Sequence, residues 1–250
     1  MNLELRSKSA IVTGGAGSIG QEICRVLASE GVRVVICDYR KKEVGTEIAR
    51  QIEEQGGEAF YHDTNIIQGA SVDALVEETL RRFGGVHFLI NCAGVAFGHY
   101  VWETPEQEWD TTLDINLKGT FLTCKAIVPY MIEQRFGRIV NIASLVSHQG
   151  SFQHAHYCAS KAGVIGFTKS LAREVGEHNV CANCISPGRI KSTMEQERQN
   201  TEQAAWIAQT PLKRMGMPLD IAKGVLYLCS SLGSFVTGET LNINGGIWIG

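Results

Sequence analysis

The feature that most constrains the fold is a short apolar run that leads straight into a glycine-rich turn and then into an amphipathic segment. Residues 10–12 are Ala-Ile-Val, residues 13–20 hold four glycines, and apolar side chains then recur at Ile23, Val26 and Leu27. This order predicts a strand, a tight turn and a helix. Glycines let a backbone approach a pyrophosphate, and the N–H groups of a helix N-terminus favour its negative charge. A tight turn without a ligand also needs glycine, so the turn alone leaves both interpretations open.

The second predicted strand ends in a carboxylate. Residues 32–37 are mostly apolar and are followed by Asp38, which lies 24 positions after Gly14. A carboxylate at the end of this strand can accept both hydroxyls of an adenosine ribose and repels the additional phosphate of NADP. Arg40 could soften that preference, although the glycine-rich turn has no basic side chain to bind a 2′-phosphate. We therefore expect the cofactor to be NAD.

A tyrosine and a lysine one helical turn apart indicate the chemistry. Tyr157 and Lys161 are separated by four positions, and Ser144 ends an apolar run upstream of them. A nearby cation favours the phenolate of a tyrosine and brings its pKa toward the range useful for catalysis. The same spacing is common on solvated helix faces, so the pair gains its weight from the turn and the carboxylate upstream.

Together these motifs resemble the short-chain dehydrogenase/reductase family over essentially all 250 residues. The resemblance implies that Ser144 orients the substrate, that Tyr157 is the acid/base, and that Lys161 binds the nicotinamide ribose and lowers the pKa of the tyrosine. It also implies that Asn116 holds a water between the lysine and solvent. In this reading, Tyr157 takes the proton of a secondary alcohol while the hydride moves to the nicotinamide.

The resemblance also assigns a set of residues to cofactor binding. The motif Asn91-Cys92-Ala93-Gly94 would line the adenosine region, Asp63 would contact the adenine, and the turn at 187–190 would meet the nicotinamide carboxamide. Two positions depart from the family pattern: Ser18 replaces the middle glycine of the first turn, and Ser192 replaces the usual threonine. The full set is Gly14, Gly17, Ser18, Ile19, Gly20, Asp38, Asp63, Asn91, Ala93, Gly94, Tyr157, Lys161, Pro187, Gly188, Ile190 and Ser192.

The order of the predicted elements indicates one α/β domain. Predicted strands at 58–62, 138–142 and 180–185 alternate with helices at 71–83, 105–134 and 157–178. This alternation predicts a Rossmann-like, doubly wound parallel sheet of about seven strands with helices on both faces. No linker or repeat divides residues 1–250, so we expect a single domain, with a substrate lid at about 189–212.

Charge and cysteine usage exclude several classes of function. The net charge is −3, no basic run is present, and no apolar stretch approaches the ~18 residues of a membrane span. We expect a cytoplasmic enzyme that binds neither nucleic acid nor membrane. The eight cysteines are mostly scattered singly and are expected to be reduced. Cys181 and Cys184 have no second ligand pair at zinc spacing, so no metal is expected.

The substrate is the least constrained part of the reading. Candidate contacts are Phe97, His99, His154 and Met194, all in segments predicted to be loops. A loop with histidines at 148, 154 and 156 could suggest a metal, but imidazoles beside the tyrosine fit hydrogen bonding to a polar substrate better. A polyol, sugar or similar small hydroxylated compound is therefore favoured, with stereochemistry and direction left open.

Two alternatives are kept. The chain also resembles 3-oxoacyl-acyl-carrier-protein reductases, which typically prefer NADP and carry arginines at two helix positions; here these are Arg135 and His178. A non-catalytic NAD-binding regulator would share the fold, since fold does not establish function. The family resemblance further implies a homotetramer or a dimer, with the tetramer favoured, assembled through the helices at 105–134 and 157–178.

Overall fold

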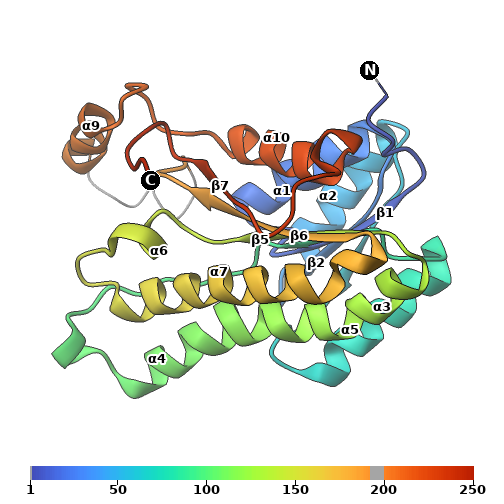
Figure 1. Cartoon of the computed structure of the whole chain (residues 1–250), viewed down its shortest axis with the longest axis horizontal. Helices are drawn as coiled ribbons and strands as arrows, with labels where there is room; N and C mark the ends of the chain where they lie inside the picture. Colours follow the sequence, from blue (N-terminus) through green and yellow to red (C-terminus); the bar gives the residue numbers. More distant parts are fainter. Residues whose placement is uncertain (1, 192–199) are drawn as a thin grey trace.

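Seven parallel strands form one sheet in the order β3-β2-β1-β4-β5-β6-β7 (Figure 1). The computed structural model describes residues 2–191 and 200–250. The strands are β1 (Ser9–Thr13), β2 (Arg33–Asp38), β3 (Ala59–Asp63), β4 (Phe88–Asn91), β5 (Gly137–Ile142), β6 (Val180–Pro187) and β7 (Thr240–Ile243). The predicted doubly wound sheet of seven strands is confirmed. The strand order reverses between β1 and β4, and a crevice for ligands forms at the carboxyl ends of the strands at such a point.

Helices cover both faces of the sheet (Figure 1). On one face lie α1 (Ser18–Ser29), α2 (Lys42–Glu54) and α10 (Pro218–Cys229), and on the other lie α3 (Gly69–Phe83), α4 (Glu106–Leu113), α5 (Gly119–Glu133) and α7 (Ala155–Val175). Other described helices are η1 (Val101–Glu103), α6 (Val146–Gln149), η3 (Gly176–His178), α9 (Asn200–Gln209) and η4 (Ser231–Gly233). Strands covered on both faces need apolar side chains on both sides, which explains why residues 34–37 are completely buried.

The long helix expected over 105–134 is built from three segments. Between α4 and α5 runs a single π-helical stretch, η2 (Asp114–Lys118). A π turn adds a residue to the helix and rotates the side chains that follow, and such turns are frequent at functional sites. Here it places Asn116, which is completely buried, toward the catalytic end of the sheet. Pro129 lies inside α5 without ending it.

Buried amides and hydroxyls connect the carboxyl ends of β4 and β5 to the helices beneath. The Asn91 side chain donates to Asn141 Oδ1 at 2.9 Å and accepts from the Thr123 hydroxyl at 2.7 Å. Asn141 in turn donates to the Thr168 hydroxyl at 2.8 Å. Each of these polar groups is buried, and each has a partner, as low-dielectric surroundings require.

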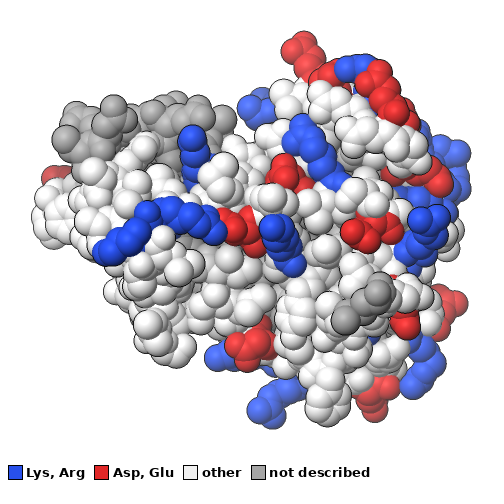
Figure 2. Space-filling model, turned by 90° about the horizontal axis from the view of Figure 1, so that it is seen from above, with Lys and Arg blue, Asp and Glu red and all other residues white. Residues whose placement is uncertain are grey.

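The cysteines lie mostly in the interior, and most of the charged side chains lie on the surface. All eight cysteines are unpaired, and burial raises the pKa of the Cys37, Cys92, Cys124 and Cys229 thiols to about 12. On the face seen in Figure 2, basic and acidic side chains are interspersed and separated by uncharged surface. None of the helices in the described ranges is long and apolar enough to cross a lipid bilayer.

Candidate active site

A cleft of about 270 Å³ opens at the carboxyl ends of the central strands. Its walls come from the glycine-rich turn, the loop after β4, the end of β5, helix α7 and the turn after β6. The lining residues are Gly14, Gly17, Ser18, Ile19, Gly20, Cys92, Gly94, Val95, Ala96, Ile142, Ala143, Ser144, Tyr157, Lys161, Pro187, Gly188 and Ile190. The structure therefore brings the first turn together with Ser144, Tyr157 and Lys161 at one cleft, while Asn116, the fourth predicted catalytic residue, is not among the lining residues.

The glycine-rich turn is shaped so that backbone, not side chain, faces the cleft. Gly14 has φ +64°, and a Cβ there would lie 2.8 Å from the backbone of Ala93, so any larger residue would be strained. Gly17 is the N-cap of α1, it has no side chain to cap the helix, and the first turn carries no acid. The N–H groups at this helix end are therefore suited to a phosphate, and a dinucleotide pyrophosphate fits the donor set.

Two carboxylates lie side by side at the ends of β2 and β3. Asp38 pairs with Asp63 across the strands and accepts hydrogen bonds from Tyr39 N at 2.8 Å and Ala16 N at 3.0 Å. Burial raises the pKa of Asp38, and these two hydrogen bonds oppose that effect. Asp63 accepts from Arg40 N at 2.8 Å and from the Tyr61 hydroxyl at 2.9 Å, and these bonds lower its pKa. Both side chains lie at this end of the sheet but outside the lining of the cleft.

Lys161 is held deep in the protein beneath Tyr157. Its Nζ donates to the carbonyl of Ile142 at 2.8 Å and lies 5.9 Å from the centre of the Tyr157 ring. Burial lowers the pKa of the lysine to about 8. A Cβ on Gly94 would lie 3.3 Å from Nζ and 3.1 Å from Asn116 Oδ1, so the lysine and the asparagine border the same point of the loop after β4.

Burial dominates the pKa of Tyr157. It raises this pKa, while the Ser144 hydroxyl and, more weakly, the charge of Arg189 act to lower it. Burial also disfavours the charge of Lys161, whose Nζ donates to a backbone carbonyl. The lowering of the tyrosine pKa by Lys161, which the family resemblance implied, stays a prediction.

Asn116 is anchored to the loop that borders the cleft. Its Oδ1 accepts from Val95 N at 2.8 Å, and its Nδ2 donates to Val95 O at 2.9 Å and to the Ser160 hydroxyl at 3.0 Å. The side chain thus positions the segment at 94–96, which lines the cleft, and ties it to helix α7 one turn from Tyr157. Its backbone carbonyl accepts from the Thr120 hydroxyl at 2.9 Å.

Four residues predicted to bind the cofactor do not line the cleft, and a fifth lies outside the described residues. Asp38 and Asp63 lie at the strand ends, Asn91 turns its amide into the core, and Ala93 packs behind Gly14. Ser192 lies outside the described residues, as does the predicted substrate contact Met194.

Cys92, which belongs to the same sequence motif as Asn91, lines the cleft instead of Asn91. Neighbouring strand residues point to opposite faces, and the motif does not reveal which one faces the ligand. Val95 and Ala96, in the predicted substrate loop, also line the cleft, and Ile142 and Ala143 are the lining residues that sequence reasoning did not assign to the site.

The other predicted substrate residues, Phe97, His99 and His154, lie in two loops that contact each other and are outside the lining of the cleft. The backbone N–H of His99 donates to Gln153 O at 2.8 Å, and its Nε2 lies 3.1 Å from Glu108 Oε2. His154 approaches Gly98 and has Nδ1 2.6 Å from Phe152 O, while Phe97 stacks on His156 with ring centres 6.4 Å apart. The loop before α4 and the loop before α7 are thus in contact with each other. Within residues 2–191 and 200–250, no group of three or more His, Cys, Asp or Glu is arranged to hold a metal ion.

Comparison with known proteins decides the family. The sequence profile of the family described as Enoyl-(Acyl carrier protein) reductase matches residues 14–248. The chain belongs to the short-chain dehydrogenase/reductase family. Short-chain dehydrogenase/reductases are oxidoreductases that act on CH–OH groups with a nicotinamide dinucleotide, which agrees with the phosphate-binding turn and with the Ser144, Tyr157 and Lys161 group in this structure.

Several relatives within this family match over nearly their whole length. The chain is 37% identical over 243 residues to the 3-oxoacyl-(acyl-carrier-protein) reductase FabG of Staphylococcus epidermidis, covering 97% of this chain and 100% of that protein. It is 36% identical over 244 residues to nodulation protein G of Rhizobium sp., covering 98% of each. The crystal structure of gox2181 superposes with a TM-score of 0.94 at 33% identity, covering 98% of this chain and 97% of the other.

Proposed function

We propose that this protein interconverts a secondary alcohol and a ketone with NAD(H), and that a 3-oxoacyl thioester is its first candidate substrate. The observation that carries the proposal is the convergence of Ser144, Tyr157 and Lys161 with the glycine-rich turn around one cleft. A hydroxyl, a phenol and an ammonium at one end of a phosphate-binding crevice form the set that carbonyl reduction requires.

Each side chain has a defined task in that reaction. The dinucleotide supplies or accepts the hydride. Ser144, two residues after β5, holds the substrate oxygen near the phenol of Tyr157, and its hydroxyl acts to lower the pKa of that phenol. Tyr157 donates its proton to the developing alkoxide in reduction and takes it back in oxidation. Lys161 presents N–H donors from below, and Asn116 fixes the loop that lies between the lysine and the cleft.

The relatives support the thioester substrate. The chain covers the whole length of reductases whose names specify 3-oxoacyl groups on an acyl carrier protein. The carrier would approach as an acidic partner, and Arg135 is exposed at one of the two positions where the resemblance expects an arginine. At the other position is His178, beside Glu177 at 3.3 Å, so the basic pair is incomplete.

A small polar alcohol is the second candidate. The loop at 94–96 lines the cleft and leads to His99, whose Nε2 lies 3.1 Å from Glu108 Oε2. We take this loop as the substrate side of the site, where the hydrogen-bonding groups suit a hydroxylated compound better than an acyl chain. Together with Asp38 this favours a dehydrogenase that uses NAD on a hydroxylated substrate. A protein that binds NADH without turnover is the remaining alternative.

Initial rates across a substrate panel separate these functions. The panel contains acetoacetyl and longer 3-oxoacyl thioesters with NADH and NADPH, and polyols, sugars and simple secondary alcohols with NAD⁺ and NADP⁺. We expect thioester reduction to be fastest. Faster turnover of a polyol or sugar would select the second candidate, and tight NADH binding without turnover of any compound would refute the enzymatic proposal.

The choice of NAD over NADP rests on Asp38. Its carboxylate lies at the end of β2, beside that of Asp63. Among the described residues, no Lys or Arg forms an ion pair with Asp38 or Asp63. A 2′-phosphate at this place would therefore face negative charge. We expect Asp38→Asn to shift the ratio of kcat/KM values toward NADP(H) by about tenfold or more. Glu43→Gln, which removes an exposed charge on the neighbouring helix α2, serves as the matched control. An unchanged ratio in Asp38→Asn would contradict the role of this carboxylate.

A further inference from the structure

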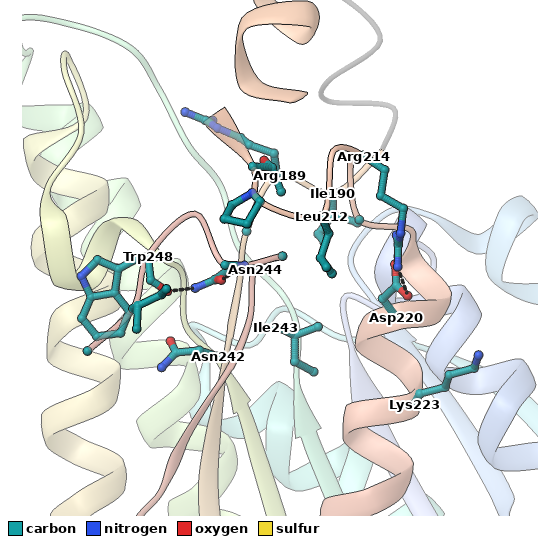
Figure 3. Close-up of a pocket in the computed structure, with 18 residues that line it drawn as sticks. Arg189, Ile190, Leu212, Arg214, Asp220, Lys223, Asn242, Ile243, Asn244 and Trp248 are labelled. Atoms are coloured by element: carbon teal, nitrogen blue, oxygen red, sulfur yellow. Dashed lines mark hydrogen bonds and ion pairs between the residues drawn. The ribbon is translucent and has the colours of Figure 1, made fainter. Parts of the chain in front are cut away.

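The segment after β7 folds back over the end of the sheet and is braced by its own side chains. Gly245 and Gly246 have φ +69° and +86°, so the chain reverses here in a conformation that glycine tolerates. Asn244 closes the reversal: its Oδ1 accepts from Gly246 N at 2.8 Å, and its Nδ2 donates to Trp248 O at 3.0 Å (Figure 3). These two hydrogen bonds fix the backbone around Trp248 and so restrict the position of its indole.

Trp248 stacks on His148, which belongs to the short helix α6 just after Ser144. The ring centres lie 4.1 Å apart with an interplanar angle of 12°. The Nε2 atom of His148 is buried and has no hydrogen-bond partner within the described part of the chain. The imidazole therefore contributes mainly a flat surface for the indole, and aromatic pairs of this kind change an equilibrium by about 2- to 12-fold.

Backbone hydrogen bonds complete a closed circle of contacts around the catalytic end of the site. His148 N donates to Leu145 O at 3.1 Å, and Leu145 N donates to Pro187 O at 3.0 Å. Gly188 N then donates to Ile243 O at 3.0 Å, immediately before the reversal that leads to Trp248. The stack of Trp248 on His148 closes this circle of contacts. Ser144 is the residue just before Leu145, which belongs to the circle.

The turn at 188–190 is held from two directions. Gly216 N donates to Arg189 O at 2.9 Å, and a Cβ on Gly188 would lie 2.7 Å from the Cα of Asn244 in the folded-back segment. A cavity of about 660 Å³ is bordered by both the turn and the folded-back segment, and Gly188 and Ile190 line both this cavity and the catalytic cleft (Figure 3). The folded-back segment is therefore one of the two supports of the turn.

We propose that Trp248 is a positioning residue: by stacking on His148 it holds the Ser144 loop against the turn at 188–190. The expected effect on turnover rests on the proposed function. The expected effect on the structure of the loop and the turn does not. Loss of the indole removes one support of both α6 and the turn, so the Ser144 hydroxyl spends less time where it holds the substrate oxygen.

The first readout is hydrogen exchange of the protein without added ligands, followed by mass spectrometry. In Trp248→Ala, peptides that cover 144–150 and 187–191 should exchange about 2- to 12-fold faster than in the wild type. Trp248→Phe keeps a ring on the imidazole and should restore most of the protection. Ile249→Ala removes a side chain that is 87% exposed in the same segment and should match the wild type.

The second readout compares the change in kcat with the change in affinity for NADH. Trp248→Ala should lower kcat by up to about tenfold while the dissociation constant for NADH changes less, and Trp248→Phe should recover kcat. His148→Ala should reproduce the loss, and the double variant should be no worse than either single one. His148→Ala also keeps the test available if Trp248→Ala does not fold.

Each outcome bears on one proposal. Unchanged exchange in both Trp248→Ala and His148→Ala, or fully additive losses in the double variant, would overturn the positioning role. A wild type that turns over no substrate in the panel would refute the proposed function instead, and the exchange result would still stand by itself.

Discussion

Desolvation sets the charge states of the residues at the centre of the site. It raises the pKa of Tyr157 and lowers that of Lys161, so both groups are pushed toward their neutral forms. A protonated phenol is the form that donates to a ketone, which suits reduction. The Ser144 hydroxyl acts against the rise in the pKa of Tyr157, in addition to the substrate-binding role proposed for this serine.

Tyr157→Phe tests the acid directly. The ring keeps its packing and only the hydroxyl is lost, so NADH binding should change little while turnover falls by about 10²- to 10⁴-fold. Fluorescence titration of NADH and steady-state rates provide the two measurements. Tyr130→Phe, at a partly exposed tyrosine on α5, is the control. Substantial activity in Tyr157→Phe would remove this residue from the mechanism.

Lys161→Met tests the buried charge through the pH dependence of stability. The folded-state pKa is about 8 and the ordinary value is 10.5, so between these pH values the unfolded chain holds a proton that the folded protein has lost. The stability of the wild type relative to Lys161→Met should therefore rise by about 3 kcal/mol from pH 8 to 10.5.

Urea unfolding at several pH values measures this difference. Lys169→Met, at an exposed position on the same helix, is the matched control and should show no such rise. A pH-independent difference for Lys161→Met would mean that the folded protein does not disfavour the charge of Lys161.

At the scale of elements, the sequence predicted what local patterns encode. Alternating apolar runs and helical periodicity located the strands and helices, and glycine and proline marked the turn at 13–20 and the turn at 187–190. The π turn at Asn116 was not predicted, because an extra residue only shifts the phase of the apolar pattern, and α4, with 8 residues, is too short to define that phase on its side of the turn. The stack of Trp248 on His148 joins positions 100 apart in sequence, and only tertiary structure brings them together.

The loop after β4 gives a prediction for an element packed against the catalytic helix. Gly94→Ala places a methyl group 3.1 Å from Asn116 Oδ1 and 3.3 Å from Lys161 Nζ, so the loop or the lysine must move. We expect kcat to fall by about tenfold or more. Gly69→Ala, where a Cβ meets nothing within 4 Å at the start of α3, should leave activity unchanged. Equal activities in the two variants would show that the close packing around Gly94 is not required.

At the scale of the whole molecule, the described helices of the α4, α5 and α7 layer leave large apolar side chains in solvent. Trp109 and Phe121 are 42% and 43% exposed, and Phe121 packs edge-on against Phe167 of α7. Association through this layer, as the family resemblance implied, would cover them. We propose that the protein is a homotetramer or dimer that uses this surface.

Light scattering coupled to gel filtration tests that proposal. We expect a tetramer, or a dimer, for the wild type and a smaller species for Phe121→Glu, because a carboxylate in an apolar interface is costly. Val44→Glu, which changes an exposed apolar residue on α2 at the other face of the sheet, should keep the wild-type mass. A monodisperse monomer of the wild type would contradict the proposal.

The buried amide and hydroxyl contacts of Asn91 and Asn141 have a consequence for how the sheet assembles. A strand that is apolar on both faces could slide along its neighbour and still bury every side chain, so hydrophobicity alone discriminates poorly against mispaired intermediates. Displacement of β4 against β5 would leave these amides without partners in a water-free interior, at a cost of about 1–3 kcal/mol for each group. The polar contacts thus favour the native register of β4 against β5 during folding. The same register fixes where Ser144, which follows β5, lies relative to the loop after β4.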